Sequence, residues 1–361
     1  MGKRVFIALS FLVGALVGLF LMFYLCDEFL GSHLNWSRTT VTTSRYELKV
    51  EGGIVTHAKP FRVHVRATDL KVNLLFRGRE RSPGESVVVE VDNLPRGFKT
   101  DYQGPGFPSR GDGTFTVVVP LRKRPVVSRL SILPSSIRMP FTFWVGGDNR
   151  KRLDILLSLL GEARRERPLF IVLGGDLVLR GLWWQYERLL EVLDDSPVPV
   201  FPVPGNHDLE FCGRRIFTRY LAPGHYSFSY GDSLFVVLDT NGKERGQLKW
   251  LDGLLRNPRY RHRFVFVHKP PFDPRQGHHH AMGDREFARR LLDLLVKRRV
   301  DVLFCSHIHS FLETRYKGLR IVITGGLGAH RKEPLEPFHY VRVKVGPSGV
   351  ELGMVRLPPA R

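Results

Sequence analysis

The stretch VPVFPVPGNHD at residues 198–208 shows a pattern that recurs earlier in this chain. A short apolar run ends in a proline and a glycine, and polar residues follow at once. The same succession recurs in FTFWVGGD at 141–148 and in LFIVLGGD at 169–176. Short apolar runs bounded by turn residues predict buried strands, so each of these strands is expected to present polar side chains at its carboxyl end.

Amphipathic segments separate these runs along the chain. Helical periodicity is present in RLDILLSLLGEARRE (152–166), WWQYERLLEVLDD (183–195), KERGQLKWLDGLL (243–255) and REFARRLLDLLVKRR (285–299). The chain returns to β-pattern near its end, in RIVITGG, HYVRVKV and VELGMVRL. Strands that alternate with helices predict an α/β domain over residues 141–361, and ligands bind at the carboxyl ends of strands in such sheets.

Five predicted strand ends carry side chains that bind metals. These side chains belong to Asp148, Asp176, Asn206, His268, His307 and His309. Each one alone has a structural explanation, as a helix cap, a turn residue or a packed histidine. Together, carboxylate, amide and imidazole groups are the ligands of borderline divalent metals. The clustering therefore predicts a metal site at one edge of the sheet.

Taken in order, these motifs resemble a known family. They are G-D-N-R at 147–150, G-G-D at 174–176, G-N-H-D at 205–208, the strand-ending His268 and H-I-H at 307–309. This order is similar to that of the calcineurin-like metallophosphoesterases, and the resemblance covers about residues 141–355. It implies a four-layer αββα sandwich, in which two packed sheets are flanked by helices and two metal ions lie at the sheet edge.

The resemblance also implies a role for each residue. Asp176 would bridge two divalent ions (Mn, Fe, Zn or Ni), with Asp148 and His309 completing one site and Asn206, His268 and His307 the other. The implied activity is hydrolysis of a phosphate mono- or diester by in-line attack of a metal-bound hydroxide. His207 would protonate the leaving group as general acid, and Asp208 would orient its ring.

Arg150 departs from the family pattern. The family often has D-x-H at the first motif, with the histidine on the first metal, whereas this chain has Asp148-Asn149-Arg150. Arginine has no lone pair to offer a cation. Two outcomes follow: Arg150 acts in catalysis by binding the substrate phosphate as a bidentate donor, or the first metal site is weak. We favour two metal ions, because Asp148 and His309 would otherwise lack a purpose.

The segment PPFDPRQGHHHAMGD at 270–284 is expected to overhang this site, because it is long and polar for a tight turn. Arg275 and His279, the latter within a run of three histidines, are candidate substrate contacts. A solvated loop is the alternative interpretation for each of them.

The region before the α/β domain has a different pattern. Short runs such as YELKVE, FRVHVRA, SVVVEV and TFTVVVPL predict a small all-β sandwich of the immunoglobulin or fibronectin kind over residues 44–124. Residues 125–140, with three prolines, are expected to be a linker. Residues 27–43 are rich in serine and threonine and are expected to be a tether.

An uncharged apolar run extends from Val5 to Leu25, after Lys3 and Arg4. As a helix it would be about 31 Å long, which matches a hydrocarbon core of ~30 Å. We therefore expect a single-pass membrane anchor over residues 1–26, with a cytoplasmic N-terminus and an extracytoplasmic catalytic domain. A cleaved signal peptide is the alternative. Ser10, Gly14 and Gly18 share one face of this helix and are candidates for a homodimer contact.

Composition excludes one class of protein and leaves several kinds of partner open. The 361 residues hold only three cysteines, which excludes a disulfide-stapled mini-protein. The formal net charge of +20 admits nucleic acid, an anionic membrane or a phosphorylated substrate as partner. No zinc-finger or RNA-recognition motif is present, so nucleic acid is the least favoured of the three. A catalytically impaired metal-binding module and a nuclease or phosphodiesterase on nucleic acid remain the alternative functions.

Overall fold

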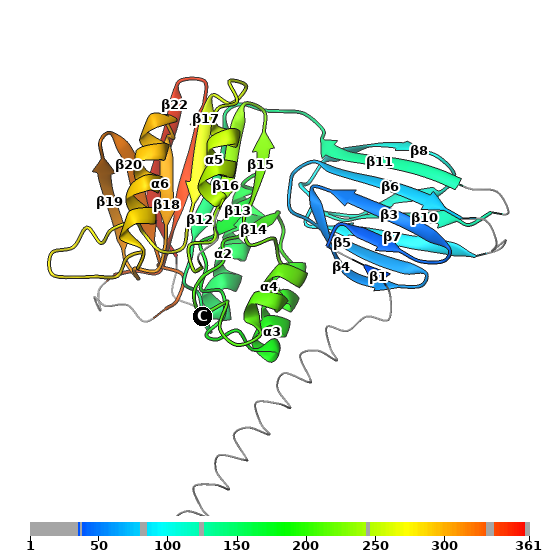
Figure 1. Cartoon of the computed structure of the whole chain (residues 1–361), viewed down its shortest axis with the longest axis horizontal. Helices are drawn as coiled ribbons and strands as arrows, with labels where there is room; N and C mark the ends of the chain where they lie inside the picture. Colours follow the sequence, from blue (N-terminus) through cyan, green and yellow to red (C-terminus); the bar gives the residue numbers. More distant parts are fainter. Residues whose placement is uncertain are drawn as a thin grey trace, which may run out of the picture.

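A computed structural model describes residues 35–36, 38–79, 85–122, 126–242, 246–329 and 336–357. Figure 1 shows an all-β part and a larger α/β part side by side. The predicted membrane anchor at 5–25, with its candidate dimer face, lies outside the described residues. Within the ranges just given, no helix is long and apolar enough to cross a membrane.

The all-β part is a sandwich of two sheets. One sheet has the order β1 (Asn35–Trp36), β2 (Thr40–Thr42), β3 (Tyr46–Glu51), β6 (Val72–Gly78), β11 (Val126–Pro134) and β8 (Phe98–Gln103). The other has the order β4 (Gly53–Lys59), β5 (Arg62–Ala67), β7 (Ser86–Asp92), β10 (Phe115–Pro120) and β9 (Phe107–Arg110). Alternate residues of both sheets form one core, as in β7, where valines at 87, 89 and 91 are buried. The pair β5–β7 is parallel, which departs from a purely antiparallel sandwich.

Two boundaries expected from sequence are wrong. Residues 126–134, expected in the linker, form β11, which pairs with β6 and β8 inside the sandwich. Its alternating burial places Val126, Leu130 and Ile132 in the core. Pro134 lies at the end of the strand and Pro140 beyond it, where a missing amide does not interrupt the pairing. The end of the expected tether also belongs to the fold, because β2 pairs with β3.

The α/β part contains two further sheets. The first has the order β14 (Val200–Pro202), β13 (Ile171–Leu173), β12 (Phe141–Gly146), β21 (His339–Gly346) and β22 (Gly349–Arg356). The second has the order β15 (Tyr226–Tyr230), β16 (Ser233–Val237), β17 (His262–Phe266), β18 (Val302–Cys305), β20 (Leu319–Thr324) and β19 (Phe311–Tyr316). Strands β12, β13 and β14 are parallel, as are β16, β17, β18 and β20.

The two sheets pack face to face through aromatic side chains. Phe143 and Phe170 from the first sheet contact Phe235 from the second, with ring centroids 5.0 to 5.3 Å apart. Helices α2 (Leu153–Glu166) and α3 (Trp183–Asp194) bury their apolar faces in the same core. Helices α5 (Gln247–Leu255) and α6 (Arg285–Lys297) pack in a separate core against the second sheet. The expected αββα layering is therefore present, and Figure 1 shows α5 and α6 overlying the strands of the second sheet.

The sandwich is docked onto the α/β part. The side chain of Asn93 donates to the carbonyl of Val200 at 3.1 Å and accepts from its amide at 2.7 Å. Leu70, from the loop before β6, is buried in the core of the α/β part. Strand β4 contacts α4 (Gly213–Tyr220), a helix that the sequence patterns did not predict. The two parts therefore share buried polar and apolar contacts.

Candidate metal centre

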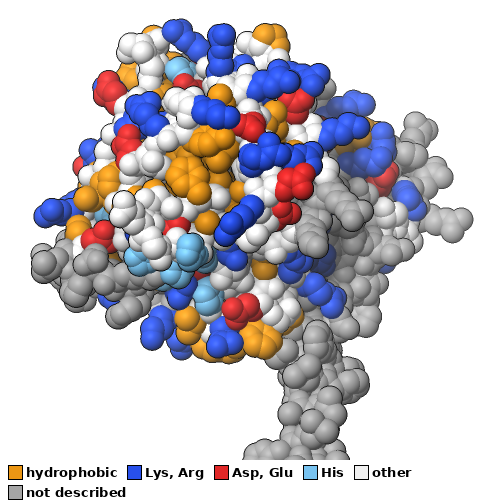
Figure 2. Space-filling model, turned by 60° about the vertical axis from the view of Figure 1, so that its left-hand side comes forward, with side chains coloured by type: hydrophobic (Ala, Val, Ile, Leu, Met, Phe, Trp, Pro, Cys, Tyr) orange, Lys and Arg blue, Asp and Glu red, His pale blue; other side chains and the backbone are white. Residues whose placement is uncertain are grey.

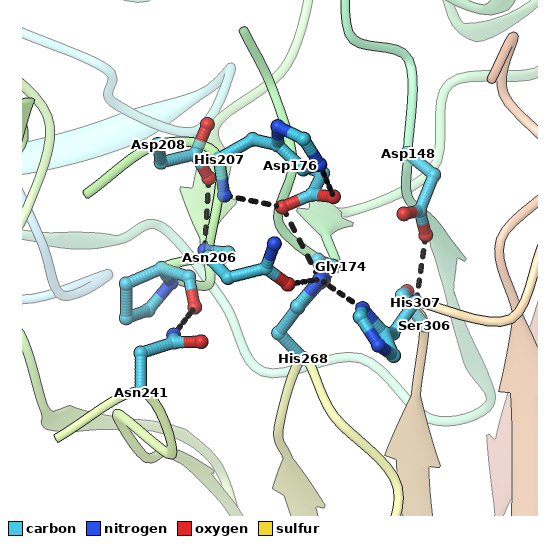
Figure 3. Close-up of polar contacts among 12 residues, drawn as sticks. Asp148, Gly174, Asp176, Asn206, His207, Asp208, Asn241, His268, Ser306 and His307 are labelled. Carbon is cyan, nitrogen blue, oxygen red and sulfur yellow. Dashed lines mark hydrogen bonds and ion pairs between the residues drawn. The ribbon is translucent and has the colours of Figure 1, made fainter. Parts of the chain in front are cut away.

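The predicted ligands come together where the parallel strands of both sheets end. Asp148 follows β12, Asp176 follows β13 and Asn206 follows β14, all from the first sheet. His268 follows β17 and His307 follows β18 in the second sheet. Figure 3 shows these five side chains converging from both sheets. Because the two sheets pack face to face, their carboxyl edges form one site.

One group of ligand atoms lies around His268. Its Nε2 is 3.2 Å from each of three atoms: Asp176 Oδ1, Asn206 Oδ1 and His307 Nδ1. Its other ring nitrogen, Nδ1, hydrogen-bonds the carbonyl oxygen of Gly174 at 2.9 Å, which fixes the ring. Ligand atoms of Asp176, His268 and His307 all lie within 4.8 Å of one another. This nitrogen and oxygen set fits a borderline divalent cation.

A second group of ligand atoms lies around Asp148. Its Oδ1 is 3.5 Å from His309 Nε2, and its Oδ2 accepts a hydrogen bond from the backbone amide of His307 at 2.8 Å. Asp148 is fully buried, and Oδ1 has no hydrogen-bond partner among the described residues. A buried carboxylate oxygen without a hydrogen bond is costly, and a bound cation would satisfy it. Asp148 and His309 therefore also fit a metal ion.

The loops that carry the predicted ligands have an unusual backbone conformation. Asp148, Asp176 and His307 all have positive φ, at 63°, 52° and 68°. Such values are uncommon for residues other than glycine and cluster at functional sites. Gly205, the first residue of G-N-H-D, packs so tightly that a Cβ atom there would overlap the backbone nitrogen of Asp176. Its glycine therefore serves the close approach of two ligand-bearing loops.

Burial and charge set the ionisation of this centre. Burial alone would raise the pKa of Asp176, but the charges of His268 and His207 outweigh it and hold that pKa well below its usual range. For His268, burial is outweighed by Asp176, which raises the pKa to about 9. Burial, aided by the charge of His268, lowers the pKa of His307 to about 3. Without a cation, a protonated His268 thus neutralises the Asp176 carboxylate.

Arg150 lies beside the carboxylate predicted to bridge two metals. Its Nη2 donates to Asp176 Oδ2 at 3.2 Å, and its backbone amide donates to the carbonyl of Asp176 at 2.9 Å. The residue has a φ of 47° and its side chain is 21% exposed, so the guanidinium also borders solvent. This position brings a fixed positive charge to the place where the family pattern has a histidine.

His207 lies at the rim of the centre, as expected, but its predicted partner is different. Its Nδ1 donates to the carbonyl of Leu179 at 2.8 Å, and its Nε2 is 3.8 Å from Asp176 Oδ2. Glu210, which the sequence analysis missed, is the carboxylate near the ring, 3.4 Å from Nδ1. Its spacing of three residues from His207 is the signal that could have identified it.

The prediction that Asp208 orients the ring of His207 is wrong. Its carboxylate accepts backbone amides from Leu177, Val178 and Gly205 at 2.7 to 3.0 Å. Burial, together with the nearby charge of Asp176, raises the pKa of Asp208. Asp208 therefore ties the loop after β13 to the loop after β14, which sets the positions of two predicted ligands.

The segment at 270–284 presents a different histidine from the one predicted. Arg275 forms a bidentate pair with Asp273 at 2.8 and 2.9 Å, so its guanidinium serves this loop rather than the metal centre. His279 is exposed and lines a hollow on the side of α6. The ring of His280 lies 6.2 Å from that of His307. His280 is thus the loop histidine nearest to the predicted ligands.

Sequence comparisons place the α/β part among known proteins. Residues 141–311 match the family model of the calcineurin-like phosphoesterases. The human serine/threonine-protein phosphatase CPPED1 is 29% identical over 196 residues, which cover 45% of this chain and 60% of that protein. The glycerophosphodiester phosphodiesterase GpdQ of Enterobacter lignolyticus is 28% identical over 188 residues, or 47% of this chain and 65% of that protein. The chain thus matches less than two thirds of the length of either relative.

A comparison of folds covers more of the chain. The purple acid phosphatase PPD1 of yellow lupin (Lupinus luteus) aligns with 86% of this chain and 73% of its own, with a TM-score of 0.54 and 14% identity. An alignment of that extent includes much of the β-sandwich as well as the α/β part, so the two-part architecture recurs in a solved structure. On the family match and the motifs, the α/β part of this chain belongs to the calcineurin-like metallophosphoesterase family.

Proposed function

We propose that this chain is a metal-dependent phosphoesterase that hydrolyses a phosphate mono- or diester. The observation that carries the proposal is the convergence of Asp176, Asn206, His268 and His307 at 3.2 Å spacings, next to the buried pair of Asp148 and His309. The family match and the similarity to a phosphatase and a phosphodiesterase support the same class of reaction.

Two divalent cations would be held by this set of side chains. Asp148, His309 and Asp176 would hold one, and Asp176, Asn206, His268 and His307 the other. When bound, such ions polarise phosphoryl oxygens and lower the pKa of a water molecule. Asp176 supplies the negative charge on which both sites depend, and its burial keeps water from screening that charge.

His207 is the proposed proton donor to the leaving group. Because Nδ1 donates to the carbonyl of Leu179, the ring is held in one orientation with Nε2 toward the centre. A protonated Nε2 can then give its proton to the departing oxygen. Glu210, beside Nδ1, would stabilise the charged ring.

Arg150 is the proposed phosphate clamp. Its guanidinium reaches Asp176 Oδ2 and borders solvent, so it can turn from this carboxylate to a bound phosphate. Planar guanidinium groups bind phosphate through two parallel hydrogen bonds. The side chain would thereby position the phosphoryl group at the metal centre.

Hydrolysis of phenyl phosphate and diphenyl phosphate tests the role of His207, because phenoxide is basic enough to need a proton as it leaves. We expect His207→Ala to lower kcat/KM at least ~100-fold, which is the range for loss of a general acid. His64→Ala, in β5 of the sandwich, is the matched control and should retain turnover. Full turnover in the His207 variant would contradict the proposed mechanism.

We also propose that residues 5–25 anchor the chain in a membrane, with the catalytic domain on the extracytoplasmic side. The uncharged run and the two basic residues before it support this orientation. N-terminal sequencing of the mature protein should find the apolar run intact. A mature chain that starts after about residue 26 would show a cleaved signal peptide instead.

A further inference from the structure

A groove of about 610 Å³ lies beside the metal centre, and none of the predicted metal ligands lines it. It runs between the beginning of α5 and the first half of α6. The loop after β16 contributes Asn241, and the residues before α6 contribute Met282 and Asp284. This volume is in the range of sites that hold small organic ligands.

The inner end of the groove borders the predicted ligands. Lys269, which lines it, is the residue after His268. Asn241 donates its side-chain amide to the carbonyl of Pro204 at 2.8 Å, two residues before Asn206. Figure 3 shows Asn241 beside Asn206. A phosphate held at the metal centre would therefore direct one of its substituents into the groove.

Much of the wall of the groove is apolar. Leu248, Met282 and Phe287 line it, and each is at least partly buried against the core beneath. A second hollow shares Met282 and is lined by further apolar residues, among them Phe272, Leu292 and Tyr316. Figure 2 shows hydrophobic side chains gathered on this face, with lysines and arginines around them. An apolar substituent would lose contact with water here.

Three positively charged side chains also line the groove. They are Lys249, Lys269 and Arg290, and none of them forms an ion pair with another residue that the structure describes. Two acidic residues, Asp284 and Glu286, also line it, so three cationic side chains face two carboxylates. Asp284 is also the N-cap of α6, where it accepts from the amide of Phe287 at 2.9 Å. The groove therefore combines apolar walls with an excess of positive charge, which suits an anionic group.

We infer that this groove binds the alcohol portion of the substrate, and that this portion is an apolar chain carrying a second negative charge. The substrate class is thus an anionic amphiphilic phosphate ester. The phosphate lies at the metal centre, the chain lies against Leu248, Met282 and Phe287, and the second anion lies near Lys249 and Arg290. This inference names a substrate for the proposed phosphoesterase activity and rests on it for the position of the phosphate.

Binding of non-hydrolysable phosphonates tests the groove without requiring turnover. Isothermal titration of the metal-loaded protein would compare methylphosphonate, octylphosphonate and 8-phosphonooctanoate. We expect the octyl compound to bind at least ~10-fold more tightly than the methyl compound, since burial of two methylene groups already provides that factor. The terminal carboxylate should add about threefold more, as expected for a partly exposed ion pair.

The double variant Lys249→Gln/Arg290→Gln should abolish the gain from the carboxylate and keep the gain from the chain. Both residues are exposed, so the fold should tolerate the changes. Lys297→Gln, exposed at the other end of α6, is the matched control and should bind all three compounds as the unaltered protein does. Equal binding of the methyl and octyl compounds would overturn the inference. A carboxylate gain that is absent, or that survives in the double variant, would overturn it as well.

Turnover separates this inference from the function on which it rests. If the protein hydrolyses 4-nitrophenyl phosphate but chain length has no effect on phosphonate binding, the role inferred for the groove is wrong and the proposed phosphoesterase activity stands. If binding depends on the length of the alkyl chain but the protein hydrolyses no phosphate ester with any metal, the groove binds the apolar chain as inferred and the proposed phosphoesterase activity is wrong.

Discussion

Replacing Arg150 by glutamine should strengthen the binding of a divalent metal at Asp148, His309 and Asp176. The guanidinium Nη2 donates to Asp176 Oδ2 at 3.2 Å, and this is the oxygen that a cation beside Asp148 would need. A cation must displace that donor and then tolerate a positive charge close by. Glutamine is shorter and uncharged, so it keeps the inner part of the side chain and removes the positive charge that competes with the cation.

The separation of the charges gives the magnitude. Two unit charges 3.2 Å apart attract by about 5 kcal/mol at an effective dielectric constant of 20. The side chain of Arg150 is 21% exposed, and the displaced guanidinium regains hydration, so we expect a net effect of about 2 kcal/mol. This corresponds to about thirtyfold tighter metal binding.

Calorimetric titration of the metal-depleted protein with Mn²⁺ measures this effect. Arg152→Gln, which removes an exposed pair with Asp154, is the matched control. The same Arg150 variant should bind inorganic phosphate about tenfold more weakly, because it loses a bidentate donor. If the Arg150 variant binds Mn²⁺ as tightly as the unaltered protein, or more weakly, and the control is unchanged, then Arg150 does not compete with the first metal ion for Asp176.

Three further changes test the supports of the site. Asp208→Ala should destabilise the fold by about 3 kcal/mol in urea unfolding, because buried backbone amides lose their acceptor, whereas a role confined to ring orientation would leave stability unchanged. Asn93→Ala should cost about 2 kcal/mol through its lost bonds to Val200 at the junction of the two parts, and a smaller loss than about 0.5 kcal/mol would deny that junction a role in stability. Burial alone would raise the pKa of Asp273, but hydrogen bonds from Arg275 outweigh it and lower that pKa well below its usual range. The stabilisation is therefore complete above pH ~4 and declines progressively as the pH falls toward the lowered pKa. Asp273→Asn should therefore cost about 2 kcal/mol at pH 7 and clearly less at about pH 2 in thermal unfolding, and an equal cost at both pH values would contradict an ion pair between Asp273 and Arg275.

The sequence predicted the α/β part well because each element carried a local signal. Apolar runs that end in glycine became β12 and β13, and the four amphipathic segments became α2, α3, α5 and α6. The ligands could be named because they follow strands, and parallel strands of packed sheets share an edge. That argument needs only the order of elements, not the position of any side chain.

The parts that failed depend on contacts distant in sequence. The interval expected as a linker became β11, because pairing with β6 and β8 outweighs the prolines around it. The role of Asp208 was misjudged for a similar reason. Adjacency to His207 suggested a contact, but neighbouring side chains diverge, and its partners come from the loop after β13.

Helix α4 and the hairpin of β15 and β16 were not predicted. The segment GRRIFTRY of α4 has only eight residues and three of them are arginine, so its buried apolar residues, Ile216 and Phe217, are too few to stand out as a helical repeat. Its position is set by packing against the sandwich and the neighbouring helix. The sequence also could not show which histidine of the loop at 270–284 lies near the predicted ligands. His280 approaches His307 only because of the path that the loop takes in the folded chain.

Metal-dependent turnover, measured in the unaltered protein and in Asp176→Asn, tests whether these side chains form a catalytic metal centre. The purified chain, freed of metal and then supplied with Mn, Fe, Zn or Ni, should hydrolyse 4-nitrophenyl phosphate or bis(4-nitrophenyl) phosphate with at least one of them. Asp176→Asn should lose both metal binding and turnover, because this carboxylate lies between the two groups of ligands. Turnover that persists without metal, or in Asp176→Asn, would contradict the account, as would no turnover with any of the four metals.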